Sequence, residues 1–155
     1  MKKIYRDAVD LNRELMKHPE KTIVFTNGVF DILHAGHIEL LEFAKAKGDL
    51  LIVGINDDAS VKRLKGDKRP IFSLEERTEL LEAVQYVDYI IPFSKDTPLQ
   101  LIQALSRIDV LVKGGDYQPH QVVGRKEVEE TGGQLCLFTF QSQMSTSDII
   151  QKITG

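Results

Sequence analysis

Two histidines, His34 and His37, stand three residues apart, shortly after an apolar run and the turn-forming pair Asn27-Gly28. The run at 23–26 predicts a buried strand, and from about Gly36 the apolar residues recur at helical spacing. Both imidazoles would therefore lie at the start of a helix, where unpaired N–H groups and the helix dipole favour an anion. Such a site suits group transfer at phosphorus, where negative charge grows in the transition state.

The histidine pair has two other interpretations. His34 could cap the helix while a half-buried His37 does no chemistry. A zinc site would need further ligands, and only Asp31 is at hand because no cysteine lies nearby. Gly36 would let the backbone come close to a ligand. The loop matches neither a Walker A nor a GxGxxG pattern, which argues against an NTPase or a dinucleotide oxidoreductase.

Three further segments carry polar groups with two interpretations each. The turn Lys113-Gly-Gly-Asp116 offers a cation and a carboxylate that orients a hydroxyl or holds Mg²⁺, or it is an ordinary strand-to-helix turn. Ser145-Thr-Ser147 forms a capping box with Asp148, and its helix end could also bind phosphate. The basic residues at 62–69 are a solvated surface or a grip for a triphosphate.

Helices and strands alternate along the chain. We expect strands at 23–26, 50–55, 88–92, 109–113 and 134–140, helices at 7–17, 36–48, 73–86, 97–107, 120–130 and 145–153, and an irregular basic loop at 59–72. Because the strands are continuously apolar, both faces of a parallel sheet should be covered. The prediction is a doubly wound, Rossmann-like α/β sheet of order 3-2-1-4-5, with ligand at the carboxyl ends of the first and fourth strands.

Composition limits the class of protein. The 155 residues are 42% hydrophobic, which predicts one domain over 1–155, with a helix in residues 1–20 packed on it. A net charge of -3 without a basic run argues against nucleic acid. No apolar stretch approaches the about 20 residues of a membrane span, and the N-terminus lacks a signal-peptide core, so we expect a cytoplasmic protein. The single cysteine, Cys136, is expected to be a buried structural thiol.

Together the motifs resemble those of the cytidylyltransferase-like nucleotidyltransferases, which share a Gly-x-Phe-Asp turn, a His-x-Gly-His motif and a late Ser-Thr helix start. Here these are residues 28–31, 34–37 and 145–147. Within this family the sequence is most similar to the branch that adenylylates D-glycero-β-D-manno-heptose 1-phosphate. The segments that carry this similarity are 25–37, 60–66, 69–70, 96–98 and 109–117. Gln85 stands where glycerol- and choline-phosphate cytidylyltransferases usually carry Arg, which counts against a cytidine nucleotide.

This resemblance, which covers about residues 20–153, implies that ATP and the heptose 1-phosphate give ADP-heptose and pyrophosphate for a surface glycan. It implies that Mg²⁺ is held by the nucleotide phosphates and not directly by the protein. The implied catalytic residues are His34, His37 and Lys65. The implied nucleotide-binding residues are Thr26, Asn27, Gly28, Val29, Phe30, Gly36, Arg77, Lys113, Gly114, Asp116, Ser145, Thr146 and Ser147. The implied substrate-binding residues are Asp31, Asn56, Arg69 and Tyr117.

Two alternative functions stay open. One is a cytidylyltransferase for glycerol 3-phosphate or a similar small phosphate ester, and the other is a non-catalytic nucleotide-binding domain. Many heptose enzymes of this type are fused to a sugar kinase. None is encoded here, so we expect a separate kinase to supply the sugar 1-phosphate. Analogy with the family also suggests a homodimer.

Overall fold

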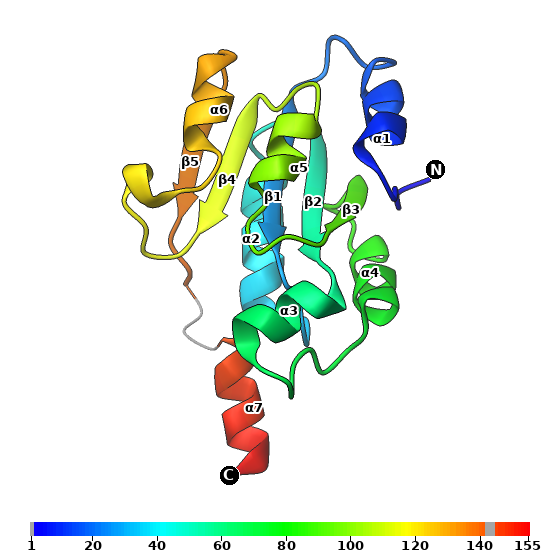
Figure 1. Cartoon of the computed structure of the whole chain (residues 1–155). Coiled ribbons are helices and arrows are strands. Elements are labelled where there is room, and N and C mark those ends of the chain that lie inside the picture. The colour runs from blue at the N-terminus through cyan, green and yellow to red at the C-terminus, as the bar shows by residue number, and fades with distance from the viewer. Residues whose placement is uncertain (1, 142–144) are drawn as a thin grey trace.

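A five-stranded parallel sheet forms the centre of the computed structural model, which describes residues 2–141 and 145–155. Its strands are β1 (Ile23–Gly28), β2 (Leu50–Asn56), β3 (Tyr89–Phe93), β4 (Val110–Gly114) and β5 (Gln134–Phe138). The strand order is β3-β2-β1-β4-β5, as predicted (Figure 1). All five arrows in Figure 1 point the same way, so their carboxyl ends share one edge of the sheet.

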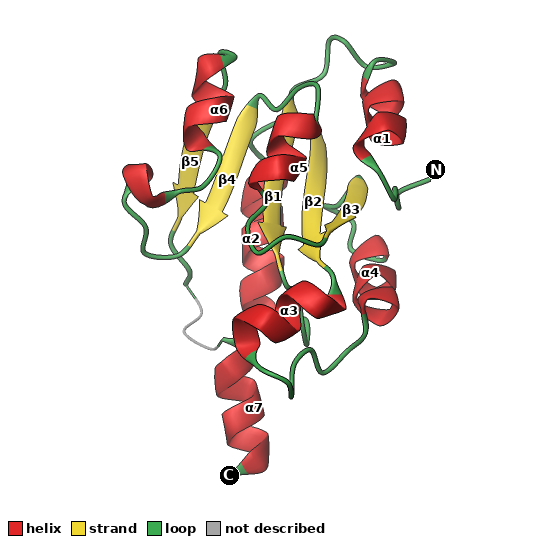
Figure 2. Cartoon of the chain, in the orientation of Figure 1, coloured by secondary structure: helices red, strands yellow, loops and turns green. Residues whose placement is uncertain are grey.

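Helices cover both faces of the sheet (Figure 2). They are α1 (Ala8–Leu15), α2 (Ala35–Lys45), α3 (Asp58–Lys65), α4 (Leu74–Glu82), α5 (Leu99–Ala104), α6 (Arg125–Glu130) and α7 (Thr146–Thr154), with a 3₁₀ turn at Pro119–Gln121. One core joins α1, α5 and α6 to the face of the sheet that carries Phe25 and Ile52. The other joins α2 and α4 to the face that carries Val24 and Val53. This alternation explains why the strands are apolar throughout.

The two central strands separate toward their carboxyl ends. β1 pairs with β4 at Val24–Val110 and Phe25–Leu111, although both strands continue beyond these pairs. Past that point a side-chain hydrogen bond connects the two strands instead of backbone hydrogen bonds: the Thr26 hydroxyl donates to the Val112 carbonyl at 2.9 Å. The crevice of a doubly wound sheet opens at this reversal of strand order.

One predicted loop is a helix. We expected residues 59–72 to be irregular, but α3 occupies 58–65. Its N-cap is Asp57, whose carboxylate accepts the Ser60 N–H at 2.9 Å. Only Ser60 and Val61 of this helix are buried, so its sequence shows little apolar periodicity. Its basic last turn, which suggested a loop, is favourable at the negative end of a helix dipole.

Several predicted boundaries were also too long. The helix expected at 120–130 begins only at Arg125, because Gly124 adopts φ 92° after the 3₁₀ turn. The helix expected at 97–107 covers Leu99–Ala104, and its N-cap is Pro98, without a side-chain cap. Cys136 is half-buried instead of buried, because β5 is an edge strand of the sheet.

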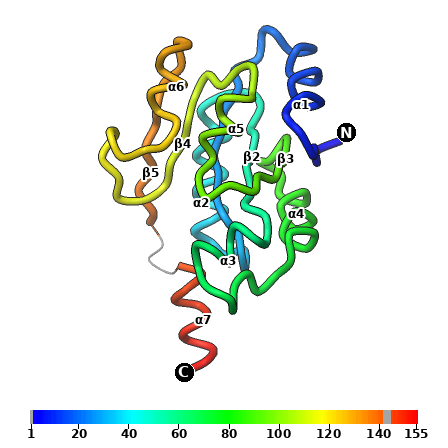
Figure 3. Tube along the Cα trace, viewed as in Figure 1, coloured from blue at the N-terminus to red at the C-terminus, as the bar shows by residue number. Residues whose placement is uncertain are grey.

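The chain ends lie far apart in the trace (Figure 3). Near the N-terminus, α1 packs Leu11 and Leu15 into the same core as the strands. The C-terminal helix α7 projects beyond the carboxyl edge of the sheet, on the same side as α3. Across the described ranges, no helix has the length and apolar character that crossing a bilayer requires.

Candidate active site

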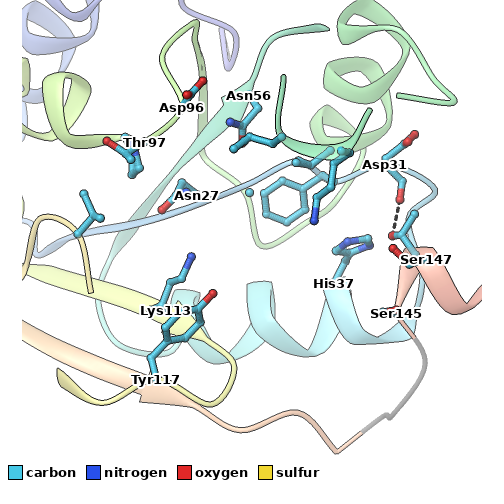
Figure 4. Close-up of a pocket in the computed structure, with 18 of the residues that line it drawn as sticks. Asn27, Asp31, His37, Asn56, Asp96, Thr97, Lys113, Tyr117, Ser145 and Ser147 are labelled. Atoms are coloured by element: carbon cyan, nitrogen blue, oxygen red, sulfur yellow. Dashed lines mark hydrogen bonds between the residues drawn. The ribbon is translucent and has the colours of Figure 1, made fainter. Parts of the chain in front are cut away.

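A cavity of about 700 Å³ lies beyond the carboxyl ends of β1, β2 and β4 (Figure 4). Most of the residues that the sequence singled out line it: Asn27, Gly28, Val29, Phe30, Asp31, His34, His37, Asn56, Lys65, Arg69, Lys113, Tyr117, Ser145, Thr146 and Ser147. The volume is that of a small-molecule site. Segments separated by more than 100 residues thus converge on one crevice.

The two histidines build the start of α2. His34 is the N-cap, and its Nδ1 accepts the Gly36 N–H at 3.1 Å. Nδ1 of His37 accepts the backbone N–H of His34 at 3.2 Å, which completes a capping box made of two imidazoles. The two rings lie against each other with centroids 3.9 Å apart and planes tilted by 33°, and the Phe30 ring lies 5.3 Å from that of His37. The capping interpretation of His34 is therefore confirmed.

This capping box fixes the chemical state of both rings. An Nδ1 that accepts a hydrogen bond carries no proton, so the neutral imidazole carries its proton on Nε2. Burial lowers the pKa of His37 to about 4, with a further contribution from His34. Burial also lowers the pKa of His34. At neutral pH both rings are therefore neutral, and each has an Nε2–H donor on the edge away from the helix backbone.

The turn before the histidines is strained. Phe30 and Ile32 both have φ of 53°, a conformation that costs a β-branched residue on the order of 1–3 kcal/mol. Asp31 lies between them, 1% exposed, and its carboxylate accepts the N–H groups of Ile71 and Phe72 at 2.7 and 3.0 Å. These hydrogen bonds hold the turn in place.

Asp31 also links two other parts of the site. Its carboxylate pairs with Arg69 at 3.2 Å, and its carbonyl accepts the Thr146 hydroxyl at 2.6 Å. The second of these is the dashed line in Figure 4. Asp31 thus ties the loop after α3 and the start of α7 to the turn after β1. These are positioning contacts, and its expected contact with substrate stays a prediction.

Two lysines give the cavity positive charge. Lys65, at the end of α3, and Lys113, near the end of β4, both line it. Burial lowers the pKa of Lys113, and the charge of Lys65 lowers it further, so the two ammonium groups repel each other. A polyanion between them would relieve this repulsion.

The N-terminus of α7 opens into the same cavity. Ser145 caps the helix: its hydroxyl accepts the Asp148 N–H at 3.1 Å, while the Asp148 carboxylate accepts the Ser145 N–H at 3.0 Å. This confirms the predicted capping box. The first-turn N–H groups at Thr146 and Ser147 cannot be paired within the helix, and such groups favour phosphate oxygens.

Five predicted nucleotide ligands lie outside the cavity lining: Thr26, Gly36, Arg77, Gly114 and Asp116. For Thr26 the reason is the hydrogen bond that pins β1 to β4. Gly36 makes room for an imidazole rather than for a ligand, since a Cβ there would lie 2.9 Å from Cε1 of His34. Gly114 makes room for the Phe140 ring in the same way, with a Cβ 2.7 Å from its Cζ. Asp116 is exposed outside the lining.

Arg77 has a different role from the predicted phosphate contact. It is 0% exposed, and its guanidinium donates to the carbonyls of Val29, Asn56 and Phe72 and to the Asp58 carboxylate, at 2.8–3.0 Å. It therefore joins the ends of β1 and β2 to α3 and to the loop before α4. All of these contacts are within the protein.

The sequence also missed part of the lining. The cavity wall is completed by Leu64, Asp96–Pro98, Leu111, Gln121–Val123 and Phe140. Thr97-Pro98 predicted a helix start and, within the string 96–98, supported the family resemblance, but neither assigned it to the site. Phe140 was expected only as the end of a strand. The aromatic residue shortly after an apolar strand was the one signal that could have indicated Phe140.

Metal ligands are scarce at this site. In residues 2–141 and 145–155, no group of three or more His, Cys, Asp or Glu side chains could hold an ion. The zinc interpretation of the histidine pair has no further support, because the Nδ1 atoms are engaged with the backbone and Asp31 with Arg69, Ile71 and Phe72.

A doubly wound sheet, paired histidines at a helix start and a second helix N-terminus facing them define a nucleotidyltransferase-type site. The chain belongs to the cytidylyltransferase-like family, whose model matches residues 25–152.

Several relatives share one name. The chain is 49% identical over 148 residues to the bifunctional protein HldE of Pelobacter propionicus, covering 96% of this chain and 30% of that protein. It is 54% identical over 140 residues to the bifunctional protein HldE of Helicobacter pylori G27, covering 90% of this chain and 29% of that protein. The chain thus spans less than a third of the length of these relatives.

Solved structures agree on the fold. A crystal structure of the lipopolysaccharide core biosynthesis protein from Thermoplasma volcanium has a TM-score of 0.64 at 25% identity, covering 80% of this chain and 99% of that one. A pantoate-β-alanine ligase from Francisella tularensis also has a TM-score of 0.64, at 15% identity, covering 99% of this chain and 77% of that one. The second likeness concerns the fold alone.

Proposed function

We propose that this chain is an adenylyltransferase that joins ATP to D-glycero-β-D-manno-heptose 1-phosphate. An oxygen of the sugar phosphate attacks the α-phosphorus of ATP in line. The new P–O bond forms as the bond to the β-phosphate oxygen breaks, which gives ADP-heptose and pyrophosphate. The chemistry needs no covalent intermediate with the protein, so positioning and charge stabilisation are the main demands on the site.

The observation that carries this proposal is the double-imidazole cap. Because each Nδ1 serves the helix backbone, each Nε2–H is a fixed donor. Preorganised donors stabilise charge that develops on phosphoryl oxygens and on the leaving oxygen. Neutral rings also donate without adding a buried charge, in agreement with the lowered pKa of His37.

Lys65, Lys113 and the N-terminus of α7 would bind the triphosphate. Lys65 and the Thr146 and Ser147 N–H groups suit the β- and γ-phosphates that leave as pyrophosphate. Arg69 lies in the lining but is paired with Asp31, so its first role is to hold the loop. Asn27 lines the cavity at the carboxyl end of β1 and suits the nucleotide, whereas Asn56, at the carboxyl end of β2, suits the acceptor.

Mg²⁺ fits this site only as part of the nucleotide complex. The described residues provide no cage of acidic ligands, whereas Mg²⁺ readily binds through substrate phosphates and water. When bound it would offset phosphate charge. The lysines and the end of α7 would then bind the remaining charge of the complex.

The heptose substrate is supported by the motif resemblance and by the HldE relatives. A cytoplasmic location and a homodimer are further expectations of this proposal. A separate sugar kinase is expected too. The relatives are named bifunctional and are more than three times as long as this chain. In those proteins the segment similar to this chain is therefore joined to a second activity.

The direct test is pyrophosphate release with ATP, CTP, GTP and UTP against heptose 1-phosphate, other sugar 1-phosphates and glycerol 3-phosphate. Turnover confined to ATP with the heptose phosphate is the expected result. Turnover of CTP with glycerol 3-phosphate would replace the substrates while keeping the mechanism. Binding of nucleotide without release of pyrophosphate under any pairing would favour a non-catalytic domain.

A further inference from the structure

Two aromatic rings, Tyr117 and Phe140, line the cavity on the side of β4 and β5, and we call them the aromatic wall. They follow neighbouring parallel strands, so the fold brings them to the same edge of the sheet. Tyr117 is 42% exposed and Phe140 36% exposed. Aromatic surface that stays exposed inside a cavity is typical of a contact site for a planar or apolar ligand.

Gly114 and Gly115 leave the space that these two rings occupy. A Cβ on Gly114 would lie 2.7 Å from Cζ of Phe140, and a Cβ on Gly115 would lie 2.9 Å from Cε2 of Tyr117. Gly115 also has φ of 118°, which disfavours any side chain. Side chains at these two positions would therefore displace Phe140 and Tyr117 from the cavity wall.

Lys113 connects the aromatic wall to the charged part of the cavity. Its ammonium lies 5.0 Å from the centroid of the Tyr117 ring, a cation–π distance that restrains the ring. Figure 4 shows Lys113 and Tyr117 together on one side of the cavity, with His37 and Ser145 on the other. A ligand with a planar end and a polyanionic end matches this arrangement.

We infer that the aromatic wall stacks against the base of the nucleotide and favours a purine over a pyrimidine. Tyr117, which the family resemblance implied as a contact of the sugar substrate, is here assigned to the base. This deepens the proposed function and rests on it, because it identifies the ligand as a nucleoside triphosphate. Stacking on an aromatic ring grows with the area of the base, and each base–aromatic contact contributes substantially to binding. Asn56, at the end of β2, is left for the acceptor.

The test measures binding of two inert analogues, α,β-methylene ATP and α,β-methylene CTP, by calorimetry. Tyr117→Leu should weaken the ATP analogue by about tenfold and the CTP analogue by less, so that the preference for the purine shrinks. Tyr117→Phe, which keeps the ring, should bind within about twofold of the wild type. Phe140→Leu should act in the same direction as Tyr117→Leu.

Tyr86→Leu is the matched control, since that tyrosine lies outside the cavity and donates to Glu42. It should leave both affinities unchanged. In turnover assays Tyr117→Leu should raise the KM for ATP and leave the KM for the sugar phosphate as in the wild type.

Wild-type affinity for the ATP analogue in Tyr117→Leu, or a rise in the sugar phosphate KM alone, would overturn the inference. Failure of the proposed function gives a different result. If the wild type binds the ATP analogue and Tyr117→Leu weakens it, but heptose 1-phosphate is never turned over, the base contact stands and the acceptor is wrong. A wild type that binds neither analogue contradicts both.

Discussion

At the scale of single residues, His34 and His37 perform a structural task that prepares them for a chemical one. In the sequence, helix capping and catalysis are alternative roles of this histidine pair. In the structure each ring caps the helix through Nδ1, which leaves its Nε2–H available to a ligand. The backbone N–H groups of Gly36 and His34 therefore select the tautomer. A residue can be essential to the local fold and to the reaction at the same time.

Replacing His37 by Ala should reduce kcat by about 10²–10³-fold, the loss typical of one preorganised donor. The KM for ATP should change little, because the lysines and α7 bind the ground state as well. Steady-state pyrophosphate release measures both constants, and circular dichroism checks the fold. Near-normal turnover in this variant would exclude a role of His37 in the reaction.

The pH dependence of stability follows from the same ring. The unfolded chain takes up the His37 proton near pH 6.5, whereas the folded protein takes it up only near pH 4. Between these values the unfolded state binds more protons, so stability is complete above pH 6.5 and falls as the pH drops toward 4. We expect a loss of about 3 kcal/mol from this residue over that interval.

Urea unfolding at several pH values tests this expectation, with His37→Ala compared to His120→Ala. The free energy of unfolding of His37→Ala should depend less on pH between 4.5 and 6.5 than that of the wild type. His120→Ala is the control, since it removes an exposed histidine outside the cavity lining. Parallel slopes in all three proteins would contradict the assignment.

At the scale of elements, the site depends on how strand ends are joined to α3 and α7. Arg77 connects the ends of β1 and β2 to Asp58 at the start of α3, and α3 carries Lys65. Asp31 connects the turn after β1 to Thr146 of α7. Neither contact is with a ligand, yet both decide where the cationic groups of the cavity lie.

Arg77→Met should therefore destabilise the fold by about 3–5 kcal/mol, since it leaves buried carbonyl groups and Asp58 without their donor. Arg77→Lys should recover part of this loss, because one ammonium cannot replace the planar fork. Chemical unfolding gives the free energies, and any folded fraction should show lower kcat. An Arg77→Met protein with wild-type stability and weaker ATP binding would restore the predicted phosphate contact.

At the scale of the whole molecule, ligand binding should stabilise the chain, because the cavity joins elements from both halves of the sheet. At a concentration 100 times its Kd, a bound nucleotide adds about 2.7 kcal/mol to the free energy of unfolding. For a chain of this size we expect the Tm to rise by about 5–10 °C.

Thermal unfolding with Mg²⁺ and α,β-methylene ATP measures this shift, and AMP at equal concentration is the comparison. AMP lacks the phosphates that Lys65 and α7 would bind, so its shift should be smaller. Equal Tm shifts for both nucleotides would show that Lys65 and α7 do not bind the β- and γ-phosphates. The same assay on Thr154→Val, a change at the far end of α7, should match the wild type.

The sequence alone determined the fold class and the strand order, because continuous apolar runs alternating with amphipathic segments allow few topologies. It also determined which segments meet, since the carboxyl ends of β1 and β4 must lie at one edge. His34, His37, Lys65 and Ser145–Ser147 were found from motifs and do line one cavity. Local signals such as caps are short-range, and they can be interpreted without the fold.

Only the tertiary structure decided what the other predicted residues do. Whether Arg77 faces a ligand or the protein depends on the carbonyl groups of Val29 and Asn56, which are 48 and 21 residues away in the chain at the ends of β1 and β2. Gly36 and Gly114 were predicted to contact the nucleotide, but a Cβ at these positions would meet His34 and Phe140, which no local pattern identifies. Helix α3 was missed for the same reason, since its few buried residues are set by packing rather than by periodicity.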